Sequence, residues 1–263
     1  MKHTQSKLIR KQITKTAEGE HASPLYVTSS FCFENAEDMR AAFADETDAN
    51  IYSRFTNPNV QEFVDRLCIL ENAEAGFATA TGMSAVFGSF MALLKKGDHL
   101  LCCNAVFGST HTVISKYLPS YGIDYTYVNA NATSAEWEAA ITPQTKMIYL
   151  ETPTNPGLEI LDLAMIGKIA KENKIIFNVD NCFATPVNQK PIDFGADFEE
   201  YKGYKIQIIN AVGQTVFSSE VNEQIANIIT HRIFQGMPEI SQRQNEQIYK
   251  YDQSKNTLTI AKK

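Results

Sequence analysis

Hydrophobic and polar residues follow two alternating periods along the middle of the chain, from about residue 59 to residue 180. Apolar residues first recur at helical spacing, and short apolar runs typical of buried strands then separate further helical stretches. Strands that alternate with helices in this way indicate βαβ units and a mostly parallel sheet. The pattern predicts helices over 60–70, 84–94, 110–117, 134–141 and 161–172, and strands over 75–79, 99–103, 125–128, 146–151 and 175–180.

The two ends of the chain lack this rhythm. The first ~55 residues are irregular, with an expected extended arm over 24–33 and a short helix over 34–43. Beyond Asp197, residues 205–219 predict a strand, a turn and a strand, and the remainder is polar and rich in Gln and Asn. We therefore expect three segments: an arm over 1–58, an α/β domain over 59–197 and an unrelated β-rich or irregular tail over 198–263.

Composition narrows the class of protein. A chain of 263 residues with 44% hydrophobic and 21% charged residues is typical of a globular protein, and a net charge of −6 argues against a nucleic-acid partner. The five cysteines show no C-x-x-C spacing, which favours reduced thiols in a cytoplasmic protein without a metal site. The polar, basic start does not resemble a signal peptide, and no apolar run approaches the ~20 residues of a membrane span.

Polar motifs follow several of the predicted strands. Gly82 lies where a strand turns into a helix, and the free N–H groups of a helix N-terminus suit a phosphate. Asp180 ends an apolar strand, where a carboxylate is costly unless paired, and the protonated ring nitrogen of pyridoxal 5′-phosphate (PLP) is one suitable partner. Taken singly, an ordinary βα turn explains the first motif and a helix cap explains the second.

Three further residues have side chains suited to the same ligand. Asn155, on a loop with two prolines, can donate a hydrogen bond to a ring oxygen, and Phe107 can stack on a flat ring. Arg54, in the irregular arm, can hold a phosphate by two hydrogen bonds. Turn chemistry, core packing and a surface arginine are the respective alternatives. Because parallel strands bring their carboxyl ends to one edge, the loops after these strands are expected to share one site.

In combination, the motifs resemble a known family. Residues 7–197 are similar to the N-terminal half of the Cys/Met-metabolism PLP-dependent enzymes, the cystathionine gamma-synthase group of the aspartate-aminotransferase fold. The phrases NIYSRFTNPNVQEF, ENAEAGFATATGMSAVF and VDNCFATPVNQKPIDFGAD are most similar to its O-succinylhomoserine sulfhydrylase branch. The resemblance covers about three quarters of the chain. It implies a truncated α/β transferase fold in which 59–197 is the N-terminal part of the PLP-binding large domain.

The resemblance also implies residue roles. Gly82 and Met83 would bind the PLP phosphate through backbone N–H groups, and Phe107 would stack on the pyridine ring. Asn155 would contact the ring O3′ oxygen, and Asp180 would pair with the ring nitrogen. A separate pair of residues in the arm, Tyr52 and Arg54, would reach the phosphate of a neighbouring subunit, which implies a homodimer or homotetramer.

The implied reaction is a gamma-replacement in methionine biosynthesis. O-succinylhomoserine or O-acetylhomoserine loses its acyl group, and sulfide adds to give homocysteine. Cystathionine gamma-synthase and gamma-lyase activities stay open as alternatives, because residues that select the thiol lie partly in the half that this chain does not match.

The chain departs from the family after Asp197. There the family continues with a strand and a Ser-x-Thr-Lys segment whose lysine holds the cofactor. Here Lys205 falls on the lysine position by count alone, while Lys202 and Tyr204 replace the Ser and Thr. Residues 204–222 instead resemble the start of a bacterial C-terminal secretion sorting domain.

This departure leaves three readings open: an impaired sulfhydrylase, an inactive fragment or composite reading frame, and a secreted β-module. In a truncated sheet, bare strand edges and apolar faces predict aggregation.

Overall fold

The computed structural model describes the chain except for residues 1–2, 195–202, 210–214, 223–248, 253–256 and 261–263, and it describes side chains up to residue 194. The chain forms two compact units. One comprises Met1–Ile69 and Met237–Lys263, and the other comprises Leu70–Gly236.

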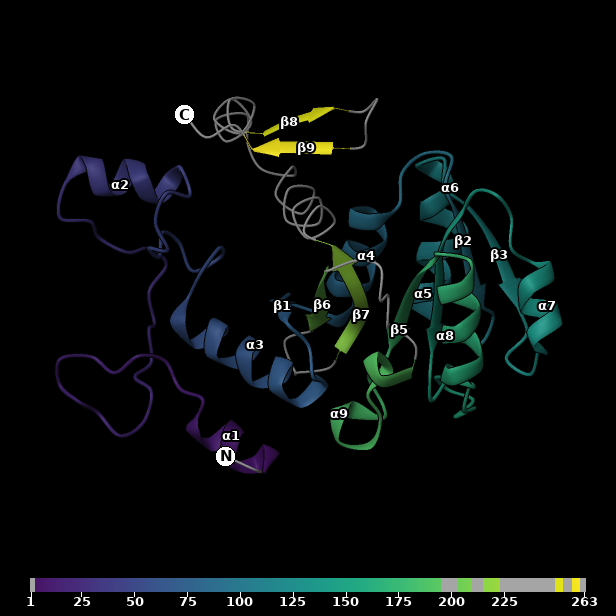
Figure 1. Cartoon of the computed structure of the whole chain (residues 1–263), viewed down its shortest axis with the longest axis horizontal. Coiled ribbons are helices and arrows are strands. Elements are labelled where there is room, and N and C mark those ends of the chain that lie inside the picture. Colours follow the sequence, from purple (N-terminus) through teal and green to yellow (C-terminus); the bar gives the residue numbers. More distant parts are fainter. Residues whose placement is uncertain (1–2, 195–202, 210–214, 223–248, 253–256, 261–263) are drawn as a thin grey trace. The chain divides into compact units, whose positions relative to one another are not determined.

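The larger unit contains the predicted βα alternation (Figure 1). In chain order its described elements are β1 (Ala75–Ala78), α4 (Gly82–Leu93), β2 (His99–Cys103), α5 (Gly108–Thr112), the π-helix η1 (Val113–Tyr117), α6 (Leu118–Ser120), β3 (Asp124–Val128), α7 (Ser134–Ala139), β4 (Thr145–Glu151), α8 (Leu163–Glu172), β5 (Ile176–Asp180), α9 (Thr185–Asn188), the 3-10 helix η2 (Pro191–Phe194), β6 (Gly203–Ile209) and β7 (Thr215–Asn222). All five predicted strands and five predicted helices of the α/β region are present, with ends shifted by a few residues.

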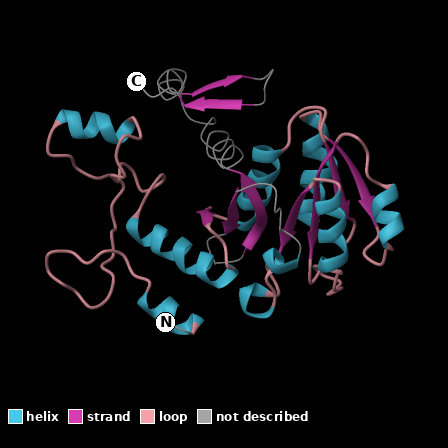
Figure 2. Ribbon diagram, in the orientation of Figure 1, coloured by secondary structure: helices cyan, strands magenta, loops and turns pink. Residues whose placement is uncertain are grey.

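A four-stranded parallel sheet in the order β3-β2-β4-β5 forms the centre of this unit. Its side chains alternate between two faces, because successive residues of a strand point in opposite directions. Leu100 and Cys102 pack with α4 and the α5–η1–α6 segment, whereas Leu101 and Cys103 pack with α7 and α8. Figure 2 shows these helices on both sides of the strands. The mostly parallel α/β fold class predicted from the sequence is therefore confirmed.

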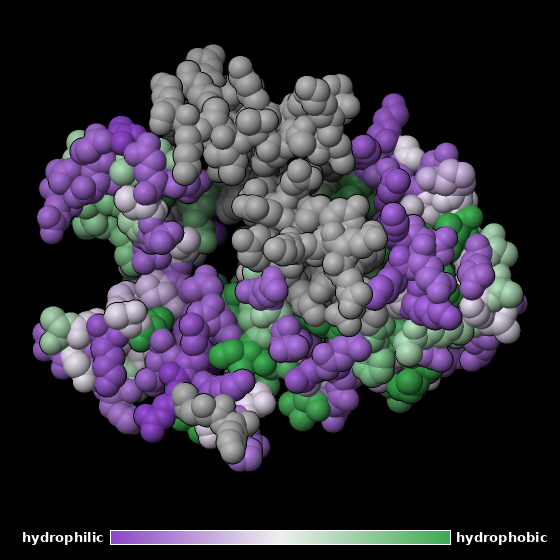
Figure 3. Space-filling view, viewed as in Figure 1, coloured by the Kyte–Doolittle hydropathy of each residue, from purple (hydrophilic) through white to green (hydrophobic). Residues whose placement is uncertain are grey.

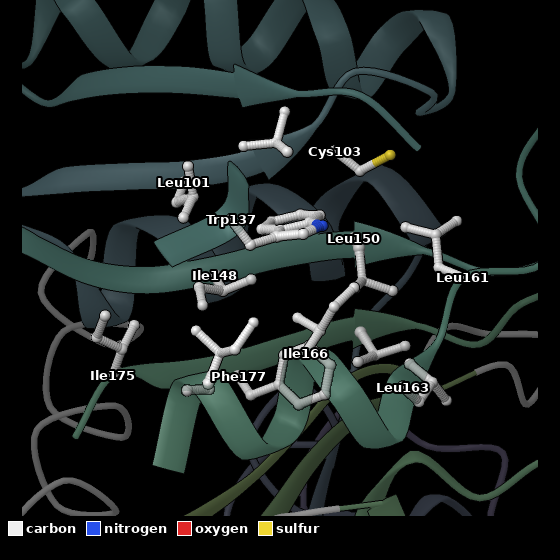
Figure 4. Packing of buried hydrophobic residues seen from close by; sticks show 14 residues of the cluster. Leu101, Cys103, Trp137, Ile148, Leu150, Leu161, Leu163, Ile166, Ile175 and Phe177 are labelled. Atoms are coloured by element: carbon white, nitrogen blue, oxygen red, sulfur yellow. The ribbon is translucent and has the colours of Figure 1, made fainter. Parts of the chain in front are cut away.

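The core beneath α8 is closely packed. Trp137 of α7 and Ile166 of α8 lie against Ile148 and Leu150 of β4 (Figure 4). All four side chains are essentially removed from solvent. This burial fixes the direction of β4 and β5, and therefore the positions of the loops at their carboxyl ends.

The predicted strand-turn-strand of the tail forms a hairpin beside this sheet. β6 pairs in parallel with β1, and β7 pairs antiparallel with β6. β7 also lies next to β5, so that the hairpin occupies the space between β1 and β5 (Figure 1). β6 therefore supplies a partner for β1, whereas β3 and β5 are the outer strands of the four-stranded sheet, and the aggregation expected from bare strand edges stays a prediction.

The smaller unit holds the N-terminal arm. It contains α1 (Thr4–Arg10), α2 (Ala36–Phe43), most of α3 (Pro58–Glu71), β8 (Tyr249–Asp252) and β9 (Thr257–Ile260). The segment after α1 is tied to α3 by the Lys11–Asp65 ion pair of 2.8 Å and by a hydrogen bond from Arg66 Nε to the Lys11 carbonyl. The irregular start expected from the sequence therefore includes one short helix that its charged composition did not reveal.

α7 begins with a capping box. Its N-cap is Thr133, whose hydroxyl accepts from the Glu136 N–H, while the Glu136 carboxylate accepts from the Thr133 N–H. Within the described ranges no helix has the length and apolarity needed to cross a membrane. The described surface in Figure 3 is largely hydrophilic, with smaller hydrophobic patches.

Candidate functional site

The N-terminus of α4 provides a place for an anion. Thr81 caps this helix by accepting a hydrogen bond from the Ser84 N–H, and the Ala85 N–H bonds to the Thr81 carbonyl. The helix itself gives the N–H groups of Gly82 and Met83 no acceptor, because they belong to its first turn. They lie just after the carboxyl end of β1, where the helix dipole favours negative charge.

Asp180 places a partly buried carboxyl group at the carboxyl end of β5. The Cys182 N–H donates to Asp180 Oδ1 at 2.9 Å. Burial raises the pKa of Asp180 to about 6, although the Cys182 N–H and the nearby Tyr149 hydroxyl each lower it. Among the described side chains, none forms an ion pair with this carboxyl group. A cationic ligand group would therefore relieve the cost of its charge.

Glu151 stands beside Asp180 on the neighbouring strand. The two residues are directly paired in the β4–β5 ladder, and Glu151 is only 4% exposed. Burial raises the pKa of Glu151 to about 7, and the charge of Asp180 raises it further, whereas backbone N–H groups of Phe107 and Asn155 lower it. Glu151 thereby joins the loop that carries Phe107 to the loop that carries Asn155.

Thr110, in α5, links the loop of Phe107 to Met83. Phe107 precedes this helix, its N–H donates to Glu151 Oε2 at 2.8 Å, and its side chain is 42% exposed. Three residues later, the Thr110 hydroxyl donates to the Met83 sulfur at 3.9 Å. The ring of Phe107 is thus free to contact a ligand, and its loop is linked to the N-terminus of α4.

Five of the predicted site residues consequently lie in one unit on connected loops: Gly82, Met83, Phe107, Asn155 and Asp180. Tyr52 and Arg54 belong to the other unit. There the Arg54 guanidinium lies 4.7 Å from the centre of the Tyr52 ring, and Tyr52 forms an isolated antiparallel bridge with Ser30.

Lys205 lies in the amino-terminal half of β6, away from the carboxyl end of that strand. It is the third residue of β6, which runs parallel to β1 with Ile206 opposite Ala75 and Ile209 opposite Ala78. The loop to Gly82 begins after Ala78, so the backbone of Lys205 is about 13 Å from that end, at ~3.3 Å per residue. The backbone arrangement does not bring Lys205 to the carboxyl edge with the other candidates.

Sequence reasoning missed three residues that shape the site. These are Glu151, which is paired with Asp180 across the sheet, Tyr149, whose hydroxyl lies near Asp180, and Gln189, which is hydrogen bonded to Thr152 and Asn181. Glu151 is the residue for which the sequence carried a signal, since it is an acidic residue at the end of an apolar run. The contacts of Tyr149 and Gln189 depend on neighbouring strands and loops, which one sequence does not specify.

The arrangement combines an open helix N-terminus, a partly buried carboxyl group with a raised pKa and an exposed aromatic ring on connected loops. A phosphate joined to a flat, protonated nitrogen heterocycle satisfies all three. The α/β fold and these three features are compatible with a protein of the PLP-dependent class.

Comparison with known proteins makes the assignment more specific. Residues 5–203 match the family described as Cys/Met metabolism PLP-dependent enzyme, and the chain belongs to this family. It is 45% identical over 183 residues to the O-succinylhomoserine sulfhydrylase of Pseudomonas aeruginosa, covering 70% of this chain and 45% of that protein. It is 35% identical over 211 residues to an L-methionine gamma-lyase of Fusobacterium nucleatum, covering 80% and 53%. The chain thus spans about half the length of these relatives.

Solved structures agree with the fold. A Campylobacter jejuni structure described as a putative O-acetylhomoserine (thiol)-lyase with N′-pyridoxyl-lysine-5′-monophosphate is similar with a TM-score of 0.73 and 26% identity, covering 86% of this chain and 55% of that one. Cystathionine gamma-lyase from Lactobacillus plantarum, in complex with L-serine, gives a TM-score of 0.71 and 30% identity, covering 88% and 58%.

Proposed function

We propose that this chain binds PLP at the carboxyl edge of its central sheet. The observation that carries the proposal is the partly buried Asp180 carboxyl group with its raised pKa. Contacts of Glu151, Phe107 and Thr110 connect it to the open N-terminus of α4. The N–H groups of Gly82 and Met83 would hold the phosphate. Asp180 would keep the proton on the ring nitrogen, and this ion pair would remove the cost of burying its charge.

The remaining residues would orient the ring. Phe107 would stack on one face of it and exclude water there, and Asn155 would donate a hydrogen bond to its O3′ oxygen. Glu151 would keep these two residues at a fixed separation, because its carboxyl group contacts the backbone of both loops. When bound and protonated, PLP withdraws electrons from an attached amino acid substrate.

The reaction we propose for this site is gamma-replacement on an O-acylhomoserine with sulfide. Identity to the sulfhydrylases supports this choice. Gamma-elimination is the second candidate, because methionine gamma-lyases are similar over an even larger share of the chain. A cystathionine gamma-synthase reaction is a third proposal. Tyr52 and Arg54 would serve the phosphate of a neighbouring copy in a homo-oligomer, which we propose acts in the cytoplasm.

Lys205 as the lysine that bonds PLP is a separate proposal, and its backbone position argues against it. Covalent attachment can be tested by incubating the full chain with PLP, reducing it with borohydride and mapping labelled peptides. We expect saturable binding with no preferred labelling of Lys205. Stoichiometric label on Lys205 would assign it the covalent role, and an assay of homocysteine formation from O-succinylhomoserine and sulfide would then show whether the chain is active.

A further inference from the structure

Gln189 closes a ring of hydrogen bonds behind the site. Its side-chain amide donates to the Thr152 carbonyl at 3.0 Å and to Asn181 Oδ1 at 2.9 Å. Asn181 in turn donates to the Gln189 carbonyl at 2.8 Å. The Thr152 N–H completes the ring by donating to the Asp180 carbonyl at 3.2 Å.

This ring of hydrogen bonds connects the two loops that carry the residues proposed to bind the pyridine ring. Thr152 begins the segment that leads to Asn155, and Asn181 directly follows Asp180. Thr152 and Asn181 are fully buried, so a lost hydrogen bond at either would not be replaced by water. Gln189 is the only described residue whose side chain donates to both loops.

The loop that Gln189 holds also contains a strained residue. Thr185 has a φ of 61°, a region that β-branched residues rarely occupy and that costs of order 1–3 kcal/mol. Its N–H donates to the Asn181 carbonyl, and its own carbonyl accepts from the Gln189 N–H, both at 3.0 Å. Such a conformation persists only where surrounding contacts impose it, and Gln189 supplies contacts at both ends of the loop.

We propose that Gln189 is a positioning residue that sets the separation between Asp180 and Asn155, and with it the fit of the pyridine ring. This inference rests on the proposed function. Gln189 touches no ring atom in this role. It acts through Thr152 and Asn181, and its loss should weaken binding of the ring while leaving the phosphate contacts at α4 intact.

Two probes separate these effects in the full chain. The first is 4′-deoxypyridoxine 5′-phosphate, which lacks the aldehyde and therefore forms no covalent bond with lysines. The second is inorganic phosphate, used as a competitor. Dissociation constants are measured by equilibrium dialysis for wild type, Gln189→Ala and Gln189→Glu, the last retaining shape but losing both donated hydrogen bonds. Asn188→Ala is the matched control, because among the described contacts its side-chain amide donates to the Ala184 carbonyl at the N-cap of α9 and to neither Thr152 nor Asn181.

The loss of about two hydrogen bonds predicts that both Gln189 variants bind the ring probe roughly tenfold or more weakly. The dissociation constant for phosphate, measured by competition, should change less than about twofold. Asn188→Ala should match wild type in both dissociation constants. Wild-type affinity for the ring probe in Gln189→Ala would overturn the inference, as would an equal loss for both probes, which indicates general damage. Failure of the wild type itself to bind the ring probe would instead refute the proposed function.

Discussion

The negative charge of Asp180 lowers the stability of the ligand-free chain, although the same charge would favour binding of a cationic ligand group. Its pKa of about 6 in the folded chain lies above the ~3.9 of an exposed aspartate. The folded state therefore holds this proton longer than the unfolded state does. The stability contributed by Asp180 is present at low pH and is lost as the pH rises from about 4 to about 6.

Asp180→Asn should accordingly stabilise the ligand-free chain at neutral pH. The asparagine stays neutral, so the free energy of unfolding should rise by up to about 3 kcal/mol, which corresponds to two pKa units. Urea unfolding at pH 5 and pH 7.5 measures the difference, which should be larger at pH 7.5. Asp193→Asn, at an exposed carboxyl group of the same unit, is the control. A less stable Asp180→Asn variant at pH 7.5 would contradict this reading.

At the element scale, sequence patterns located the strands and helices of the α/β region because their burial is nearly complete. His99–Cys103 was predicted to the residue, since all five of its side chains are buried. α1 was missed because it buries no residue, so that no apolar periodicity marks it. The same reasoning applies to the site: Gly82 and Asp180 are visible at strand ends, whereas the roles of Gln189 and Tyr149 come from contacts between distant segments.

Three neighbouring strands are joined by one buried histidine. His99 of β2 is hydrogen bonded to the hydroxyls of Thr145 in β4 at 2.8 Å and Thr126 in β3 at 2.9 Å. Burial lowers its pKa, against the opposing charge of Asp124. The folded state therefore favours neutral His99, and the stability it contributes is present above the unfolded pKa of ~6.5 and is lost as the pH falls below it.

His99→Gln should remove part of this pH dependence. The variant should be about 1–2 kcal/mol less stable than wild type at pH 8, because two buried hydrogen bonds are altered, and the gap should narrow at pH 5. Thermal or urea unfolding at both pH values measures it, with His21→Gln, at an exposed histidine, as control. A gap that widens on acidification would show that His99 is not held neutral.

Across the larger unit, the two strands β6 and β7 of the tail lie beside strands of the α/β region that would otherwise have no neighbour there. β6 covers β1, and β7 lies beside β5. The sequence revealed the two strands but not their partners, because pairing between segments more than a hundred residues apart leaves no local pattern.

Proline at Ile206, opposite Ala75 in the β1–β6 pair, tests this arrangement. A proline inside a strand flanked on both sides removes a donor and disturbs the ladder, so Ile206→Pro should lower stability by about 1–3 kcal/mol and promote aggregation. Light scattering and urea unfolding report both effects. Ser134→Pro is the control, since the first position of a helix tolerates proline. An Ile206→Pro variant as stable and dispersed as the control would show that β6 does not protect β1.

The chain spans about half the length of its relatives, and we propose that it nevertheless holds PLP through Asp180 and the N-terminus of α4. The decisive experiment is equilibrium dialysis of the purified full chain against 4′-deoxypyridoxine 5′-phosphate, with wild type and Asp180→Asn side by side. We expect one saturable site per chain in the wild type and binding at least about tenfold weaker in Asp180→Asn. The absence of saturable binding by the wild type, or equal affinity in both proteins, would contradict this proposal.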